Sequence, residues 1–244
     1  MFHRMFWTER RFAGIILMLG FLLYVVAVIF MPRDAQGNFL VLLPDRAALL
    51  LVAAHPSLTQ WSFSLFIGGS IVTPLGLAML TRLISDAGDR TFSQMALIAA
   101  LFGAMLWVTY LALSLGISLL AAQETARTGV VPGYYAPFGA TTQPLFVIYT
   151  LLTFAAVLAY GGAVLNTRVL PHWVGWVTIA YTLFNLLTTI FSGGVAVPFI
   201  HYVMPMLMGI LLLLRRYQLP PASHQKEASA VASTIEVESK EQTP

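Results

Sequence analysis

Six segments of this chain are long, strongly apolar and almost free of charge. They contain no aspartate, glutamate or lysine, and their single arginine, Arg82, stands near the end of the second segment. About 20 helical residues cross the roughly 30 Å hydrocarbon core of a bilayer, and backbone groups in lipid must be paired internally. We therefore predict an all-α, six-transmembrane-helix bundle. The predicted spans are 12–31, 58–84, 95–122, 144–165, 173–192 and 195–214.

The scarcity of charge excludes whole classes of protein. Only 9% of the 244 residues are charged, whereas a soluble domain carries about 25%. A surface with so little charge excludes a soluble enzyme and a nucleic-acid binder, so the lipid bilayer is the expected partner. The chain also contains no cysteine, which excludes disulfide scaffolds and thiolate chemistry.

The arginines and lysines predict the orientation, because cytoplasmic loops carry an excess of both. With the N-terminus in the cytoplasm, three of the 13 basic residues, Arg33, Arg46 and Arg127, fall on the outer side. The other ten fall on the inner side, so we expect both termini in the cytoplasm of a bacterial cell, with the protein in the inner membrane. The inner residues are Arg4, Arg10, Arg11, Arg82, Arg90, Arg168, Arg215, Arg216, Lys226 and Lys240.

Two outer loops are long enough to hold structure. In the first, Asp45 stands at a cap position and Pro56 follows the apolar run, which predicts a short interfacial helix over 47–54. The second, 123–143, combines proline and glycine with tyrosines and a phenylalanine. We expect it to form a structured cap over the mouth of the bundle, with its aromatic rings at headgroup depth.

The last part of the chain has a different composition. After Pro220 and Pro221 it runs through serine, lysine and glutamate with few apolar residues, a pattern typical of disorder. We therefore expect a transmembrane domain over 1–216 and a disordered cytoplasmic tail over 217–244.

Neutral polar side chains recur at helical spacing within the predicted spans. Such stripes are typical of packing seams between membrane helices, or they converge on a cavity for a neutral or amphiphilic ligand. The stripes are Thr178, Thr182, Asn185 and Thr189; Trp107, Tyr110, Ser114 and Ser118; Tyr149, Thr153 and Tyr160; Gly69, Thr73 and Gly76; Gly20 and Tyr24. The candidate ligand-binding residues are Asn185, Thr182, Tyr110, Ser114, His201 and Tyr24. Asn185 is the first choice, because a buried amide has four hydrogen-bonding positions to satisfy.

The sixth span contains one histidine and several methionines. His201, Met204 and Met208 fall on one helical face, and imidazole with thioether suits Cu(I). A haem held by His201 and His55 is a related possibility. Methionine is, however, a common filler of apolar helices, so we expect no metal or cofactor. His201 remains a candidate because ionisable side chains within a membrane are rare and functional.

The chemistry missing from the spans narrows the function. Proton or ion coupling needs intramembrane carboxylates, lysines or a filter, and motifs for nucleotide binding or hydrolysis are absent. We expect a non-enzymatic accessory or structural protein, or a binder of a neutral or lipid-like ligand. A small-solute transporter is the first alternative, and a haem- or copper-binding protein using His201 is the second.

Two patterns at the ends of spans carry a family resemblance. Residues 170–176, LPHWVGW, open the fifth span, and the final span contains Pro205 and Gly209 and ends Leu214-Arg215-Arg216. In these features the chain resembles uncharacterised bacterial six-span membrane proteins of the domain-of-unknown-function type. The resemblance covers the spans and excludes the tail. It implies a multi-pass inner-membrane protein and assigns no catalytic residue.

Overall fold

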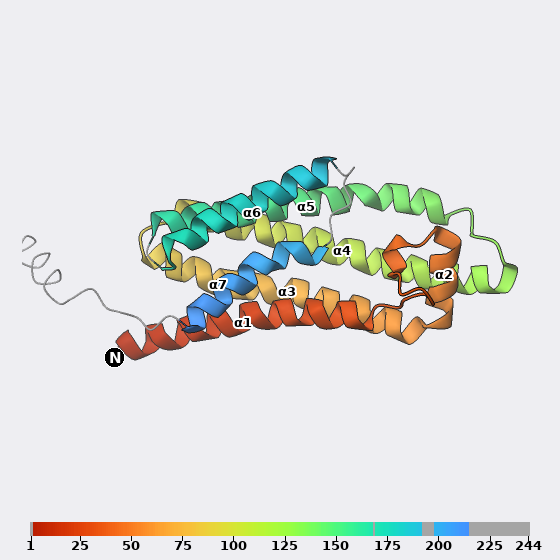
Figure 1. Ribbon diagram of the computed structural model, residues 1–244, viewed down its shortest axis with the longest axis horizontal. Coiled ribbons are helices and arrows are strands. Elements are labelled where there is room, and N and C mark those ends of the chain that lie inside the picture. Colours follow the sequence, from red (N-terminus) through yellow and green to blue (C-terminus); the bar gives the residue numbers. More distant parts are fainter. Residues whose placement is uncertain (1, 168, 192–197, 215–244) are drawn as a thin grey trace, which may run out of the picture. The chain divides into compact units, whose positions relative to one another are not determined.

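The computed structural model describes residues 2–167, 169–191 and 198–214, and regular structure in this part of the chain is helical (Figure 1). Residues 1–213 form one compact unit. Almost all of the second unit, 214–244, lies outside the described residues, and so does the predicted disordered tail. The helices are α1 Phe2–Phe30, η1 Leu40–Leu42, α2 Asp45–Ala54, α3 Pro56–Asp86, α4 Thr91–Thr128, α5 Tyr135–Asn166, α6 His172–Phe191, η2 Pro198–Tyr202 and α7 Val203–Leu214.

Five of these helices, α1, α3, α4, α5 and α6, are long and apolar enough to cross a membrane. Their outward faces carry large apolar side chains: on α1, Ile15, Leu22 and Ile29 are all more than half exposed. Contiguous apolar surface of this extent is not left exposed to water. The protein is therefore a multi-pass membrane protein with an all-helical fold, as the sequence predicts.

The sixth predicted span, 195–214, takes a different form. Its described part is the short 3₁₀ helix η2 followed by the twelve-residue helix α7, which is shorter than a membrane-spanning helix. Pro205 explains the break, because it has no N–H to donate to the carbonyl of His201 and its ring crowds that carbonyl. The α-helix therefore starts only at Val203, and the chain ahead of it adopts the tighter helix.

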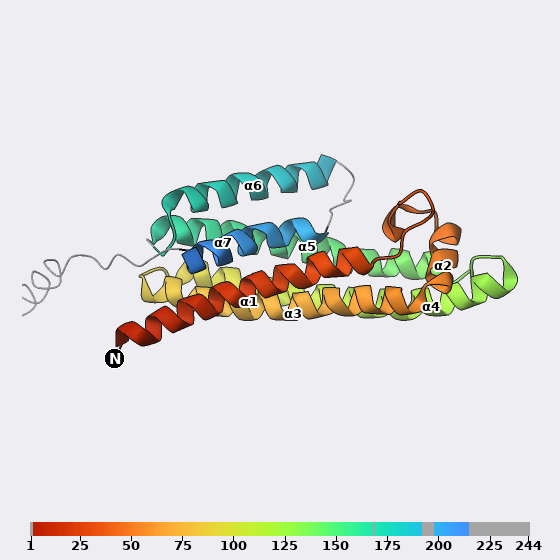
Figure 2. The same ribbon diagram turned by 60° about the horizontal axis from the view of Figure 1, so that its bottom comes forward.

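Neighbouring helices approach closely through glycines. α1 packs along α3, and α3, α4, α5 and α6 contact one another in chain order (Figures 1 and 2). A Cβ placed on Gly14 of α1 would lie 2.8 Å from the carbonyl oxygen of Gly209 on α7. A Cβ on Gly175 of α6 would lie equally close to the carbonyl oxygen of Gly161 on α5. Small residues at these crossings permit the tight packing on which membrane helices depend.

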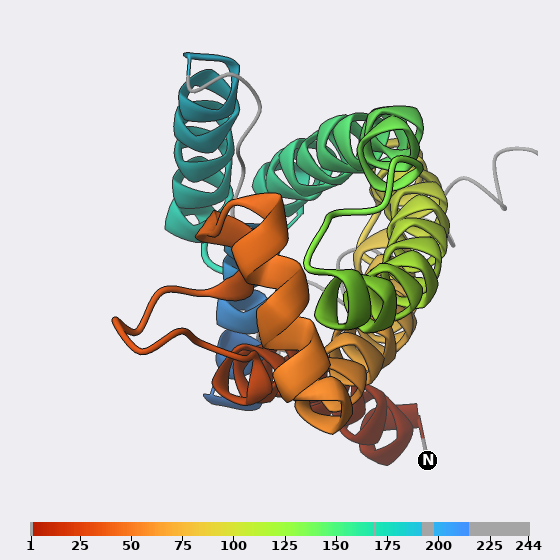
Figure 3. The ribbon, with the colours of Figure 1, turned by 90° about the vertical axis from the view of Figure 1, so that its right-hand side faces the viewer.

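One end of the bundle extends well beyond a bilayer core. α4 has 38 residues, so at 1.5 Å per residue it is about 57 Å long, against a core of about 30 Å. The short helix predicted over 47–54 is present there as α2 (Figure 3). Its Leu49 and Val52 pack against Ala121 and Ala122 of α4.

The predicted loop over 123–143 is mostly helical at this same end. α4 continues until Gly129, whose positive φ of 76° ends the helix. α5 then starts at Tyr135, so six residues, 129–134, connect the two helices.

Candidate functional site

A cluster of buried aromatic residues meets at the hydroxyl of Tyr24, in the last two turns of α1. This hydroxyl donates to the hydroxyl of Tyr202 at 2.7 Å and lies 2.6 Å from Oγ of Ser70. The indole N–H of Trp107 donates to it at 3.0 Å. Tyr24 is fully buried, so one polar group joins α1, α3, α4 and η2 inside the apolar bundle.

Stacked rings extend this cluster from Tyr24 toward α5. The ring of Tyr24 stacks on Tyr202 with centroids 3.9 Å apart, and Trp107 stacks between Tyr110 at 5.3 Å and Tyr149 at 4.6 Å. His201 then meets Tyr149 edge-on, with 5.7 Å between the ring centroids. His201 also meets Phe154, with 4.4 Å between the centroids. The ring contacts therefore run from Trp107 through Tyr149 to His201, and the hydrogen bond from Trp107 connects them to Tyr24.

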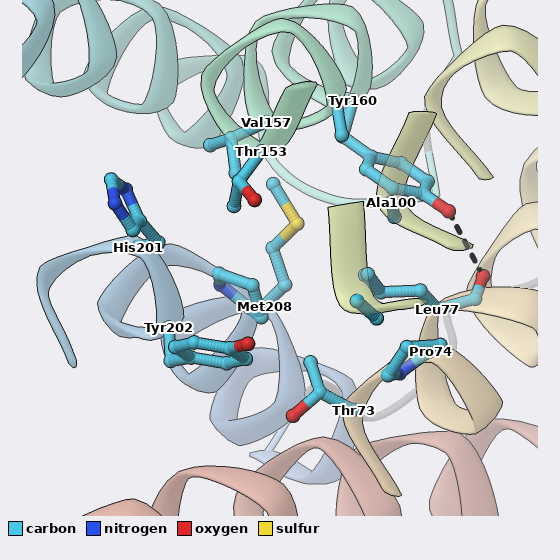
Figure 4. A pocket seen from close by; sticks show the side chains of 13 residues that line it. Thr73, Pro74, Leu77, Ala100, Thr153, Val157, Tyr160, His201, Tyr202 and Met208 are labelled. Carbon is cyan, nitrogen blue, oxygen red and sulfur yellow. Dashed lines mark hydrogen bonds between the residues drawn. The ribbon is translucent and has the colours of Figure 1, made fainter. Parts of the chain in front are cut away.

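A cavity of about 30 Å³ lies beside the cluster (Figure 4). Its walls come from α3, α4, α5, η2 and α7, and Tyr202 belongs to both the cluster and the wall. The polar residues on the wall are Thr73, Thr153, Tyr160, His201 and Tyr202, and the rest of the lining is apolar. This volume holds roughly two water molecules.

Two polar side chains on the wall lack partners. His201 is 3% exposed, and neither of its ring nitrogens has a hydrogen-bond partner among the described residues. Within the same set of residues, Oγ1 of Thr73, also 3% exposed, has none. Buried polar groups are almost always hydrogen-bonded. In contrast, Thr153 donates to the carbonyl of Tyr149 at 2.8 Å, and Tyr160 donates to the carbonyl of Leu77 at 3.2 Å.

The charged groups lie away from the cavity. None of its lining residues is an acid, a lysine or an arginine. Among the described residues, an ion pair joins Arg82 to Glu9 at 3.3 Å. In the loop after α1, the side-chain amide of Asn38 and neighbouring backbone N–H groups lower the pKa of Asp34. The cavity itself is uncharged when His201 is neutral.

The structure distributes the sequence-predicted candidates over three places. Tyr24 is the centre of the aromatic cluster, and His201 lines the cavity. Tyr110 stacks on Trp107, and Ser114 interacts with Tyr110 one turn further along α4.

Asn185 and Thr182 lie apart from that cluster, on α6, which contributes no residue to the cavity wall. The amide of Asn185 donates to the carbonyl of Tyr181 at 2.7 Å, and the hydroxyl of Thr182 donates to the carbonyl of Thr178 at 2.7 Å. Both side chains therefore hydrogen-bond within their own helix.

Sequence reasoning did not select Tyr202, Thr73, Trp107 or Tyr149 as site residues. Thr73, Trp107 and Tyr149 belong to the polar stripes, but helical spacing does not distinguish them from the other stripe residues. Tyr202 stands next to His201, and its contact with Tyr24 joins residues 178 positions apart. Helical spacing shows which residues share a face of one helix, but it does not show which helices meet.

The histidine and methionines of the sixth predicted span point in different directions. Met208 lines the cavity with His201, whereas the sulfur of Met204 accepts a contact from Thr178 at 3.7 Å. In the described part of the chain, no three His, Asp or Glu side chains gather into a group that could hold a metal ion.

Comparison with known proteins found no matching family model, no matching curated protein and no matching solved structure. The resemblance to six-span bacterial proteins therefore remains a prediction from the sequence. Any function must be argued from the site itself.

Proposed function

We propose that the protein is a six-span inner-membrane protein with both termini in the cytoplasm. Five long apolar helices support the proposal, and η2 with α7 supplies a sixth, shorter apolar segment. The distribution of basic residues, ten inner against three outer, supports the orientation.

We further propose that the protein is a non-enzymatic binder of a small neutral ligand, and that the cavity beside His201 is its binding site. One observation carries this proposal: a buried histidine, with neither nitrogen hydrogen-bonded to a described residue, lines a cavity inside the membrane domain. Ionisable side chains at membrane depth are rare and mark functional positions. A concave, mostly apolar site with a few polar groups is also the usual form of a small-molecule site.

Cysteine chemistry tests whether a small neutral molecule reaches the cavity. The natural chain has no cysteine, so Val157→Cys would be its single thiol, on the cavity wall. The matched control is Val164→Cys on the same helix, which is fully buried and does not line the cavity. The probe is methyl methanethiosulfonate, which is small and uncharged.

We expect the thiol at position 157 to react about tenfold faster than the thiol at 164, because reactivity follows access. Mass spectrometry of membranes sampled over time measures both rates. Equal rates at the two positions would contradict a binding site open to small neutral molecules.

A small-solute transporter remains the second candidate, and the break between η2 and α7 favours it. Transporter sites are commonly built where a membrane helix is interrupted, and His201 and Tyr202 stand in the turn before α7. Uptake of a neutral solute into proteoliposomes, lost on filling the cavity with Ala156→Phe, would support this candidate. Equal uptake by protein-free vesicles would count against it.

A further inference from the structure

The polar atoms of the residues around the cavity are enclosed or hydrogen-bonded elsewhere. The hydroxyl of Thr73 packs against Gly20 of α1, and the ring nitrogens of His201 are enclosed by other atoms of the bundle. The other three polar residues of the wall use their hydroxyls in hydrogen bonds within the bundle: Thr153, Tyr160 and Tyr202. The surface of the cavity is therefore almost wholly apolar.

A cavity with such a surface stays dry. Its volume of about 30 Å³ would hold roughly two water molecules, but a buried water molecule needs roughly two to four polar partners. The described residues of the wall do not offer such a set. Apolar cavities inside proteins remain free of water and take up apolar molecules instead, so an apolar occupant fits this one.

Residues of several helices keep this space open. Pro74 of α3 and Pro205 of α7 both line the cavity, and a proline inside a helix removes a backbone hydrogen bond and crowds the preceding turn. On α4 and α5 the lining includes Ala100, Ala104 and Ala156, whose side chains end at Cβ. The cavity therefore results from residues on four helices, and not from one short side chain.

The size of the cavity limits its occupant to about two heavy atoms, because roughly two water molecules would fill it. We propose that the cavity is a site for an apolar molecule of this size, the class to which dioxygen belongs. Such molecules concentrate in the hydrocarbon core around the protein, because their transfer out of water is favourable. This inference rests on the proposed function and specifies the ligand class of that same site.

Two methionines of α7 provide a matched pair of probes within the natural chain. Met208 lines the cavity and points toward Thr153 and Val157 of α5 (Figure 4). Met204 lies one turn earlier, does not line the cavity and contacts Thr178 instead. Met208 is 1% exposed and Met204 is 5% exposed, so lipid hardly reaches either side chain. A molecule inside the cavity is therefore close to Met208 and further from Met204.

Dioxygen itself is the first probe, because it is paramagnetic and speeds the relaxation of nuclei close to it. The full-length protein in lipid nanodiscs is labelled with ¹³C at its methionine methyl groups, and relaxation is recorded under dioxygen and under nitrogen at equal pressures. A ligand with two heavy atoms has a Kd no tighter than about 6 mM, so several pressures are compared. We expect dioxygen to speed the relaxation of Met208 several-fold more than that of Met204. Loss of a resonance in Met208→Leu or Met204→Leu assigns it.

Ethane and methanol test the chemical class of the ligand. Each has two heavy atoms, but only methanol forms hydrogen bonds, and these would be lost in a cavity that offers none in return. We expect ethane to shift the methyl resonance of Met208 more than that of Met204. Methanol at the same concentration should shift neither resonance.

Filling the cavity should abolish the response to dioxygen. Ala156→Val adds two carbon atoms at the wall, which matches the size of the proposed occupant, so Met208 should then respond no more than Met204. The matched control is Ala163→Val, which adds the same two carbons at a fully buried position of α5 off the cavity wall. It should leave the response of Met208 unchanged. The comparison of the two methionines in the natural chain does not depend on either variant.

Three results would overturn the inference. Equal responses of Met208 and Met204 to dioxygen would show that the cavity takes up no apolar molecule. A shift of Met208 by methanol as large as that by ethane would show a polar site, and a response to dioxygen that persists in Ala156→Val would show that dioxygen binds elsewhere.

The failure of this inference is distinguishable from the failure of the proposed function. If Met208 and Met204 respond equally while Val157→Cys still reacts faster than Val164→Cys, the ligand class is wrong and the proposed function stands. If the two thiols react equally, the proposed function fails, and the assignment of the ligand class fails with it.

Discussion

At the scale of single residues, the hydroxyl of Tyr24 joins more elements than any other group described above. It contacts Ser70, Tyr202 and Trp107 within 3.0 Å. Each partner lies on a different element, and the surroundings are apolar, so no water competes for these hydrogen bonds. A buried polar network of this kind favours one arrangement of the helices over alternatives of similar packing.

Tyr24→Phe should therefore destabilise the bundle. The variant keeps the ring stacked on Tyr202 but leaves the indole N–H of Trp107 without its acceptor, and an unsatisfied buried group costs about 1–3 kcal/mol. Unfolding in detergent mixtures, followed by circular dichroism, measures the loss. Tyr134→Phe is the control, because Tyr134 pairs with Glu124 on an exposed surface and its loss should cost less than about 0.5 kcal/mol. Equal losses in the two variants would contradict a structural role for the buried network.

The loop after α1 should depend on pH through Asp34. Its carboxylate accepts hydrogen bonds from the backbone N–H groups of Gln36 and Asn38 and from the side-chain amide of Asn38. These bonds lower the pKa of Asp34, the amide of Asn38 contributing most. The stabilisation is therefore present above the ordinary aspartate pKa of about 3.9 and is lost as the pH falls through the lowered value.

The amide resonance of Asn38, recorded against pH, measures this transition. We expect a midpoint below about 3.9, and we expect no transition in Asp34→Asn. A midpoint at or above the ordinary value would contradict the hydrogen-bonding arrangement of this loop.

At the scale of helices, the sequence predicts the elements better than their ends. All five long helices appear where apolar segments predict them, because lipid leaves the backbone no alternative to helix. The predicted spans stop at the membrane surface, however, whereas α4 continues to Thr128 and α5 begins at Tyr135. The extension of α4 is explained by packing, because Leu49 and Val52 of α2 bury its surface beyond the bilayer core. The sequence of α4 alone does not show that α2 packs there.

The crossing of α1 and α7 should tolerate no side chain. In Gly14→Ala the added methyl would lie 2.8 Å from the carbonyl oxygen of Gly209, so the two backbones must move apart. We expect a loss of about 1–3 kcal/mol, as in other overpacked sites, measured by the same detergent unfolding.

Gly116→Ala on α4 is the matched control for this crossing. A Cβ at Gly116 meets nothing within 4 Å, and alanine favours a helix over glycine by about 1 kcal/mol. This variant should therefore be neutral or slightly stabilising. Similar losses in both glycine variants would show that the cause is not the contact between α1 and α7.

At the scale of the whole molecule, the proposed orientation can be tested with impermeant thiol reagents. Gln36→Cys lies between α1 and α2, and Ala87→Cys lies between α3 and α4; both positions are exposed. With an odd number of membrane crossings between them under the proposed topology, Gln36→Cys should react in intact cells and Ala87→Cys only after permeabilisation. The reverse pattern would place the N-terminus outside, and equal reaction in intact cells would contradict a span over α3.

The candidate site is less predictable from sequence than the fold. The polar stripes contained Thr73, Trp107 and Tyr149, and the scarcity of ionisable residues selected His201. The hydrogen-bonding capacity of its amide makes Asn185 the first choice from sequence, yet that amide donates to a carbonyl of its own helix at 2.7 Å. Which stripes face one another depends on the order of helices around the bundle. The residue pattern within a single helix does not predict that order.

The break ahead of α7 has a consequence for how the protein is assembled. Chain synthesis delivers α1, α3, α4 and α5 to the membrane before η2 and α7, which bring His201, Tyr202 and Met208. Until that last segment docks, with Gly209 against Gly14, the cavity lacks the wall formed by η2 and α7, and Tyr24 lacks its stacked partner. The surface of α1 that packs against η2 and α7 therefore stays without its partner until the last helix has been synthesised.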